Sequence, residues 1–250
     1  MNPNRIQLRN VDLHYAATAY RERSIKSLML GLIRKRRAPR IADIHALKDI
    51  TLEIGQGARV GLMGHNGSGK STFLKTVAGL YPISGGRLEV SGKISALFDL
   101  GLGFEPEATG RENILFRGLL LGHTPAYMRA REAEIVDFAG LGEFIDYPMK
   151  TYSAGMQVRL AFAISTAVGG DILLLDEVIG AGDASFMAKA KARIAELIAR
   201  SDILVLASHD LATLASLCTR GLVFHHGSLI FDGPVEQAIA AYKTANGLPP

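Results

Sequence analysis

The chain has 250 residues, 48% of them hydrophobic, which is enough to bury the core of one large domain or two small ones. Its single cysteine, Cys218, excludes an intrachain disulfide, and no apolar run reaches the roughly 20 residues that a membrane span needs. The formal charge is +4, but eight basic residues and one acidic residue gather between Arg21 and Arg40, so the rest of the chain is slightly acidic.

The first 54 residues contain two strand patterns separated by the basic segment. Arg5 to Tyr15 alternates apolar and polar residues with a slip at Asn10, which predicts an edge strand with a bend. His45 to Ile54 predicts a second strand. Between them, apolar residues from Ile25 to Ile33 recur at helical spacing and predict a basic helical insertion at about residues 21–40. Such a helix lies on an anionic membrane, docks on a partner, or packs on its own domain, and the pattern leaves these alternatives open.

A glycine-rich phosphate-binding loop follows. Residues 64–71 read Gly-His-Asn-Gly-Ser-Gly-Lys-Ser, between a strand pattern at Arg59–Met63 and a helical pattern from Thr72. The glycines let successive backbone N–H groups point at phosphate oxygens, and the helix start adds its positive end. In this motif Lys70 reaches the β- and γ-phosphates, and the Ser71 hydroxyl holds Mg²⁺. The predicted nucleotide-binding residues are Gly64, His65, Asn66, Gly67, Ser68, Gly69, Lys70, Ser71 and Thr72.

The middle of the chain changes from strand to helix patterns. Arg87–Val90 and Lys93–Phe98 read as hairpin-like strands that add an antiparallel layer. Arg111–Leu121 and Thr124–Ala139 read as helices, and with the following turn and helix they predict a helical subdomain at about residues 105–168.

Two polar segments in this part of the chain suggest further pieces of a nucleotide site. Ile172–Asp176 is an unbroken apolar strand that ends in two carboxylates, Asp176 for Mg²⁺ and Glu177 to orient the attacking water. Ser153 precedes a small-residue helix at Ala154–Val168. It is either a second phosphate cradle or a plain helix cap.

Histidines follow the last two strand patterns. His209 comes just after the strand Ile203–Ala207, and it reaches the γ-phosphate edge if that strand neighbours the Asp176 strand. His225 and His226 are adjacent on an apparent hairpin, so we expect them to face opposite sides as structural residues, not as a metal pair. Strands that alternate with helices in this way predict an α/β fold with a mainly parallel sheet.

Taken in order, these pieces resemble the ATP-binding subunit of an ABC transporter, a P-loop NTPase with an antiparallel β subdomain and an α-helical subdomain. The resemblance covers almost the whole chain and implies a single domain at residues 1–250. It implies ATP hydrolysis with Mg²⁺, with Glu177, His209 and Lys70 as catalytic residues. It further implies that Tyr15 stacks on adenine and that Asp183 lies in a loop that crosses a dimer seam. In the implied head-to-tail dimer, Ser153, Ala154 and Gly155 of one copy complete the ATP site of the other.

Two departures from the family pattern narrow the resemblance. The usual Leu-Ser-Gly-Gly-Gln signature is Tyr152-Ser153-Ala154-Gly155-Met156 here, and the glutamine-bearing loop has no glutamine. Asp99 is its nearest match and a third candidate for a metal ligand, with Ser71 and Asp176. Both departures look like the O-antigen and teichoic-acid exporters, some of which add a C-terminal carbohydrate-binding domain. This chain stops at Pro250, which is too early for one.

The resemblance implies an exporter that moves a lipid-linked polysaccharide across the cytoplasmic membrane. Its partners would be ATP, a second copy of the chain and a homodimeric membrane-spanning permease, with the chain peripheral on the cytoplasmic face and not bound to nucleic acid. The alternatives are an ABC ATPase for another cargo and a non-transport ABC ATPase that acts on nucleic acid. The basic segment alone supports the last of these.

Overall fold

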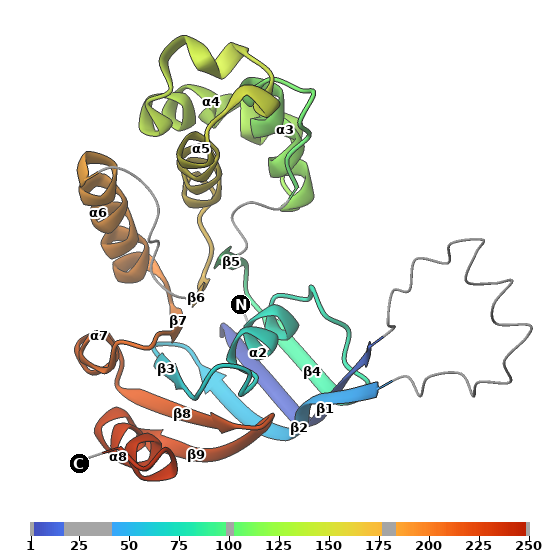
Figure 1. Ribbon diagram of the computed structural model, residues 1–250, viewed down its shortest axis with the longest axis vertical. Coiled ribbons are helices and arrows are strands. Elements are labelled where there is room, and N and C mark those ends of the chain that lie inside the picture. Colours follow the sequence, from blue (N-terminus) through green and yellow to red (C-terminus); the bar gives the residue numbers. More distant parts are fainter. Residues whose placement is uncertain (1–2, 18–41, 99–102, 177–183, 249–250) are drawn as a thin grey trace, which may run out of the picture.

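Two sheets with one apolar core between them make up the main body of the protein (Figure 1). The computed structural model describes residues 3–17, 42–98, 103–176 and 184–248. The first sheet is antiparallel in the order β2-β1-β4, with β1 at Arg5–Ala17, β2 at Ala42–Gly55 and β4 at Gly85–Ser91. The second has six strands in the order β5-β6-β7-β3-β8-β9.

The six-stranded sheet is parallel except for its last strand. Its members are β3 (Arg59–Met63), β5 (Ile94–Leu97), β6 (Ile172–Asp176), β7 (Ile203–Ala207), β8 (Arg220–His225) and β9 (Ser228–Pro234). Only β9 runs antiparallel, as the second strand of a hairpin with β8. The prediction of a mainly parallel sheet is therefore confirmed.

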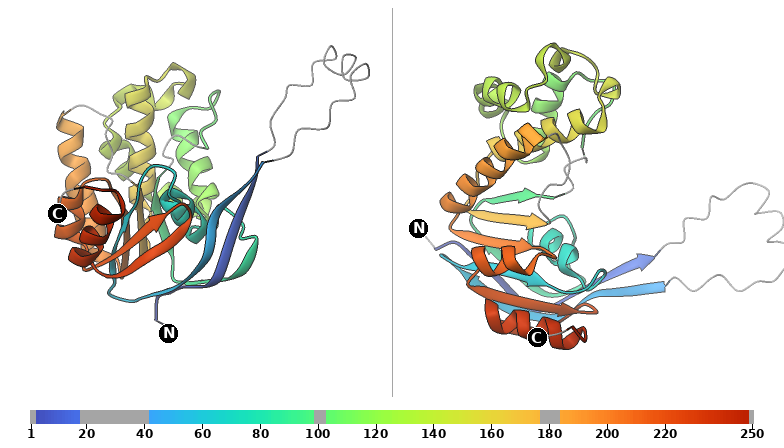
Figure 2. Two further views of the ribbon diagram at one scale, coloured as in Figure 1. Left: turned by 60° about the horizontal axis from the view of Figure 1, so that its bottom comes forward. Right: turned by 60° about the vertical axis from the view of Figure 1, so that its left-hand side comes forward.

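The unbroken apolar strands of this sheet are buried on both faces. In β6, Ile172 and Leu174 pack into the core shared with the antiparallel sheet, and Leu173 and Leu175 pack into a second core on the opposite face. Helix α2 (Lys70–Val77) lies between the sheets, with its buried Phe73 in the first core. On the other face lie α6 (Ala184–Arg200), α7 (Leu211–Leu217) and α8 (Val235–Ala245) (Figure 2). Strands covered on both faces read as continuous apolar runs, as the sequence does here.

The helical region packs around a third core of its own, above the sheets in Figure 1. It contains α3 (Gly110–Leu120), α4 (Pro125–Ala139) and α5 (Ala154–Ala167), with short 3₁₀ turns at Gly142–Asp146 and Met149–Thr151. Local sequence sets these helix ends. Thr109 and Glu112 form a reciprocal capping box at α3, and α4 begins at Thr124-Pro125 and ends at a left-handed Gly140.

Two of the strand predictions are wrong in placement. β1 is a central strand, because it pairs with both β2 and β4, although its bend at Asn10 is real and carries a positive φ of 48°. β4 and β5 do not form a hairpin. Gly92, with a φ of 119°, turns the chain between them so that β5 pairs with β6 in the other sheet. A side chain at Gly92 would press on Asn4 and Ile172, so only glycine fits this crossing.

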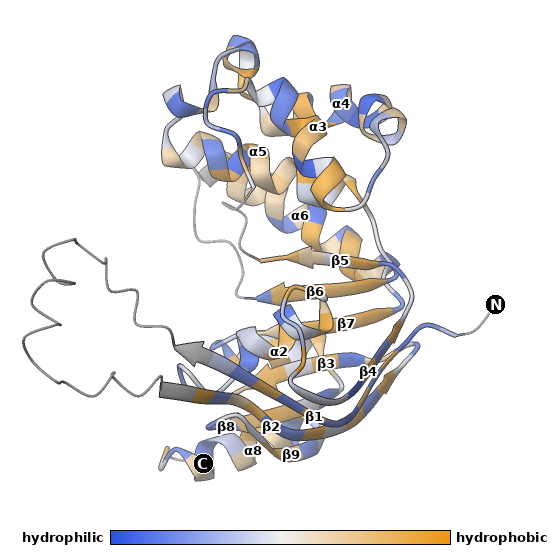
Figure 3. Ribbon diagram, turned by 90° about the vertical axis from the view of Figure 1, so that its right-hand side faces the viewer, coloured by the Kyte–Doolittle hydropathy of each residue, from blue (hydrophilic) through white to orange (hydrophobic). Residues whose placement is uncertain are grey.

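The hydropathy of the residues agrees with the burial of the six-stranded sheet, whose strands are largely apolar in Figure 3. No helix within the described ranges is both long and apolar enough to cross a membrane.

Candidate nucleotide-binding site

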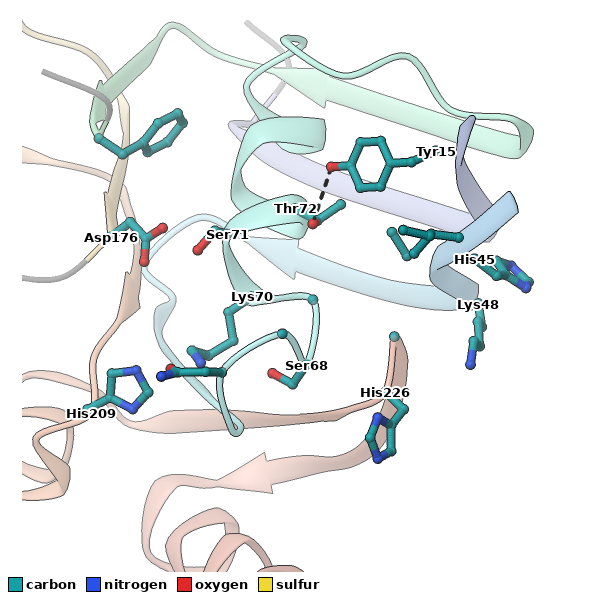
Figure 4. Close-up of a pocket in the computed structure, with 17 residues that line it drawn as sticks. Tyr15, His45, Lys48, Ser68, Lys70, Ser71, Thr72, Asp176, His209 and His226 are labelled. Atoms are coloured by element: carbon teal, nitrogen blue, oxygen red, sulfur yellow. Dashed lines mark hydrogen bonds between the residues drawn. The ribbon is translucent and has the colours of Figure 1, made fainter. Parts of the chain in front are cut away.

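A cavity of about 880 Å³ opens between the two sheets, at the start of α2 (Figure 4). This volume is in the range of small-molecule sites. The cavity is lined by Tyr15, Ile44, His45, Ala46, Lys48, residues 66–72, Phe98, Asp176, His209, His226 and Gly227. Among these described residues, Lys48 and Lys70 are cationic and Asp176 is the one carboxylate, so the lining favours an anionic ligand.

The loop between β3 and α2 forms the floor of the cavity. At Gly64 a Cβ atom would collide with the Ser68 hydroxyl and with the backbone oxygen of Phe224, so glycine is required there. Gly69, the N-cap of α2, has a φ of 113° and provides no side-chain cap. The first N–H groups of α2 therefore have no capping side chain, and they suit a phosphate.

Lys70 is buried within this loop. Its ammonium group donates to the backbone oxygens of Gly64 at 2.7 Å and His65 at 3.3 Å. These bonds hold the cation beside the loop, where an incoming phosphate would meet it.

Asp176 and His209 reach the same cavity because their strands are neighbours. β6 pairs with β7, with Asp176 opposite Ala207, and β7 pairs with β3. The strand before His209 is therefore a neighbour of the Asp176 strand, as the prediction for His209 required. The side chains of Asp176 and His209 both point into the cavity in Figure 4. Ser71 and Asp176 bring a hydroxyl and a carboxylate to this edge, which are the hard oxygen donors that Mg²⁺ prefers.

Tyr15 forms the opposite wall of the cavity. Its hydroxyl bonds to the Thr72 hydroxyl at 3.3 Å, and its ring meets Tyr81 edge-on at 5.4 Å. Partial burial raises the pKa of Tyr15, so its phenol, which is neutral at physiological pH in any case, stays neutral over a wider pH range. A neutral ring on the wall fits the role of stacking on a base, which stays a prediction.

Several lining residues were not predicted. His45 and Lys48 come from β2, whose His45 pairs with His14 in the strand that carries Tyr15. Nothing in the sequence set these two residues apart, because polar residues recur along the whole of β2. Phe98 follows β5, and His226 and Gly227 form the β8–β9 turn.

The expectation that His225 and His226 face opposite sides is wrong. The rings of both residues lie against His65, with centroids 5.2 Å and 4.7 Å from it. His226 is in the turn with a positive φ of 46°, so strand alternation does not apply to it. The pKa of His226 is lowered mainly by the neighbouring His225. Loss of solvent, His65 and Lys48 lower it further, in that order.

Ser153, Ala154 and Gly155 lie apart from these residues, at the start of α5. Ser153 is the N-cap, and its exposed side chain accepts the Met156 N–H at 3.3 Å. None of the three lines the cavity of its own chain. This placement is compatible with both alternatives, a cap alone and a cap that also faces another copy.

Three predicted positions and one segment lie outside the described residues. They are Glu177, Asp99, Asp183 and the basic segment at residues 21–40. Glu177 directly follows Asp176 in the chain, and Asp99 directly follows Phe98.

The sequence is similar to named export proteins. A family model described as ABC transporter matches residues 47–180. The O-antigen export system ATP-binding protein RfbE of Yersinia enterocolitica is 44% identical, over 78% of this chain and 82% of that protein. RfbB of Myxococcus xanthus, with the same description, is 44% identical over 90% of this chain, which spans about half (52%) of its length. The teichoic acids export ATP-binding protein TagH of Listeria monocytogenes is 33% identical, over 95% of this chain and 69% of that protein.

Solved structures agree with the fold. An ATP-binding cassette solved as a dimer, in a post-hydrolysis state with ADP and phosphate, superposes with a TM-score of 0.66 at 22% identity. The match covers 92% of this chain and 98% of that one. The ATP-binding subunit of an ABC transporter gives a TM-score of 0.68 at 19% identity, over 97% and 93% of the two chains.

Proposed function

Since the chain belongs to the ABC transporter family of ATP-binding domains, we propose that it is the ATP-hydrolysing subunit of a polysaccharide exporter. The cargo would be a lipid-linked polysaccharide of the O-antigen or teichoic-acid type. One observation carries the enzymatic half of this proposal: the phosphate loop, Asp176 and His209 face one cavity from three adjacent parallel strands. In α/β sheets, ligands bind at the carboxyl ends of such strands.

The phosphate loop would bind and orient the triphosphate. The backbone N–H groups at the start of α2 would hold the phosphate oxygens. Lys70 would exchange its bonds to the Gly64 and His65 carbonyls for bonds to the phosphates, which bring a stronger charge-assisted interaction. Ser71 and Asp176 would hold Mg²⁺, which neutralises charge on the phosphates when bound.

Glu177 and His209 would act on the attacking water. Glu177 directly follows Asp176, the last residue of β6, in the chain. A carboxylate there would orient the water and accept its proton. His209 is exposed on the same edge and would contact the terminal phosphate.

A second copy would complete the site. Ser153 is exposed at the start of a helix and outside its own chain's cavity, so its hydroxyl and the first N–H groups of α5 would be free to contact the nucleotide of another copy. A head-to-tail dimer would therefore close over two ATP molecules, with Tyr15 against each adenine.

The relatives' names support the choice of cargo. Proteins from three genera that are 33% to 44% identical to this chain over the aligned residues are described as O-antigen or teichoic acids export ATP-binding proteins. By analogy, the chain would sit on the cytoplasmic face of the membrane, held there by a membrane-spanning permease. The basic segment at residues 21–40 would add contact with that permease or with anionic lipid.

Glu177→Gln tests the enzymatic assignment. The amide cannot accept the water's proton, so ATP hydrolysis by the purified protein should fall by about 100-fold or more, whereas ATP binding and dimer formation persist. Glu196→Gln, on the exposed face of α6, is the matched control and should hydrolyse ATP at the wild-type rate. Full turnover by the Glu177→Gln variant would contradict the assignment.

The cargo is tested in cells. A strain whose only copy carries Glu177→Gln should accumulate lipid-linked polysaccharide on the cytoplasmic side and lose it from the surface. Normal surface polysaccharide in that strain, with hydrolysis abolished in the purified protein, would reject this cargo and leave the ATPase assignment standing.

A further inference from the structure

Three histidines from two distant segments meet at the edge of the phosphate loop. His65 is the second residue of the loop, His225 is the last residue of β8, and His226 begins the β8–β9 turn. The His225 and His226 ring centroids are 4.3 Å apart, and one ring nitrogen of each of the three residues lies within 4.8 Å of the others. Three imidazoles this close form a ligand set for a metal ion.

The β8–β9 turn is fixed in this place by its backbone. His226 and Gly227 both have positive φ values, 46° and 85°, as a tight two-residue hairpin turn requires. The Gly227 N–H donates to the Ser68 oxygen at 2.8 Å, and the Lys48 N–H donates to the Gly227 oxygen at 2.9 Å. The turn is therefore bound to the phosphate loop on one side and to β2 on the other.

The hydrogen bonding of His65 prepares one ring nitrogen for a metal. Its Nδ1 lies 2.7 Å from the backbone oxygen of Asn66, which can only accept, so Nδ1 carries the proton. Its Nε2 then holds the lone pair, and this buried atom has no hydrogen-bond partner among the described residues. Metal-bound histidines commonly donate their other N–H to a backbone carbonyl in this way.

We propose that His65, His225 and His226 bind a borderline transition-metal ion of the Zn²⁺ type, with a fourth position open to water. A tetrahedral Zn²⁺ with Zn–N distances of about 2.0–2.1 Å spaces its ligand nitrogens roughly 3.3 Å apart. The imidazoles have to close by about 1.5 Å at most, and the exposed His226 has room to rotate. Bound metal would join the phosphate loop to the hairpin through side chains as well as backbone.

This metal differs from the Mg²⁺ of the nucleotide. Mg²⁺ takes oxygen ligands, whereas an all-imidazole set selects Zn²⁺, Ni²⁺ or Cu²⁺. A second group, Asp12, His14 and His45, also has the required proximity. In that group, however, His45 Nε2 already forms a hydrogen bond with Asp12 Oδ1 at 2.6 Å. We therefore use these three residues as the comparison group in the test below. Burial raises the pKa of the Cys218 thiol to about 12, which keeps it protonated and out of competition for the metal.

Co²⁺ and Zn²⁺ titrations of the tag-free full-length protein, without nucleotide, test the proposal. Co²⁺ should give visible absorption bands of nitrogen ligation that Zn²⁺ abolishes, and Zn²⁺ should raise the Tm. His225→Gln should weaken Zn²⁺ binding by more than about tenfold, because even loss of an outer partner of a metal has that effect. His14→Gln, in the comparison group, should bind as the wild type does.

His225 does not line the nucleotide cavity, so His225→Gln should keep the wild-type ATPase rate when Mg²⁺ is present and Zn²⁺ and Co²⁺ are absent. Equal Zn²⁺ affinity in wild type and His225→Gln would overturn the proposal, as would loss of binding in His14→Gln alone. If the His225→Gln variant does not fold, a measurement on the wild-type protein still tests the proposal. Zn²⁺ should protect the peptide that carries His225 and His226 from modification by diethyl pyrocarbonate, and unchanged modification would also overturn the proposal.

Discussion

The nucleotide cavity and the helical region expose opposite kinds of side chain. Among the residues that the structure describes, the cavity presents glycine backbone, two lysines, histidines and one carboxylate between buried apolar strands. The helical region keeps its own apolar core, yet α3 leaves Phe116 and Leu120 40% and 72% exposed, and Phe144 and Tyr147 are exposed near the 3₁₀ turn. The first surface suits a small charged ligand, and the second suits an apolar macromolecular partner.

The largest effect should come from the cavity. Lys70→Ala removes the ammonium group from the phosphate loop, so ATP hydrolysis should fall by about 100-fold or more, the scale for a lost charge-stabilising donor. ATPase rates of the purified variants measure this. Lys189→Ala, exposed on α6, is the matched control, and an equal loss in both variants would mean that the effect does not come from the position of Lys70 in the cavity.

A core substitution in the helical region should affect stability instead. Leu160→Ala in α5 empties a fully buried site, which typically costs about 2–5 kcal/mol of unfolding free energy. Because Leu160 packs in the core of the helical region and not in the two cores around the sheets, hydrogen exchange should speed up in α3, α4 and α5 more than in β3 and β7. Uniform acceleration across both regions would show that they unfold as one unit.

The smallest effect on the isolated chain should come from the exposed face of α3. Leu120→Ser should change the unfolding free energy by less than about 0.5 kcal/mol and leave the ATPase rate unchanged. If this face meets the membrane-spanning partner, the variant should nonetheless co-purify with the membrane fraction less well than wild type. Ser216→Ala, on the exposed side of α7, is the control and should co-purify with the membrane fraction as the wild type does. Equal co-purification of Leu120→Ser and wild type would place the contact elsewhere.

The sequence predicted correctly the strands, the loop and the helix that have a strong local sequence pattern. The glycines around Lys70 and the apolar run before Asp176 predicted a strand, loop and helix that the structure contains. It failed where the answer depended on long-range pairing. Nothing local to Arg5–Ala17 shows that two strands flank it, and Gly92 gives no sign of which sheet the next strand joins.

The histidines show the same limit at the site. His209 was predicted to reach the site on the condition that its short apolar strand neighbours the Asp176 strand, and the structure meets this condition. The meeting of His65 with His225 and His226 depends on a turn conformation and on contacts 160 residues apart in the chain, which no spacing rule reports.

The crossing at Gly92 has a mechanical consequence. It places Tyr15 and Asp176, which lie on opposite walls of one cavity, in two different sheets. A molecule long enough to touch both walls would link the two sheets, in addition to their shared apolar core and to hydrogen bonds such as that of the Lys48 N–H to the Gly227 oxygen. Cleavage of such a molecule would remove this additional link between the two sheets.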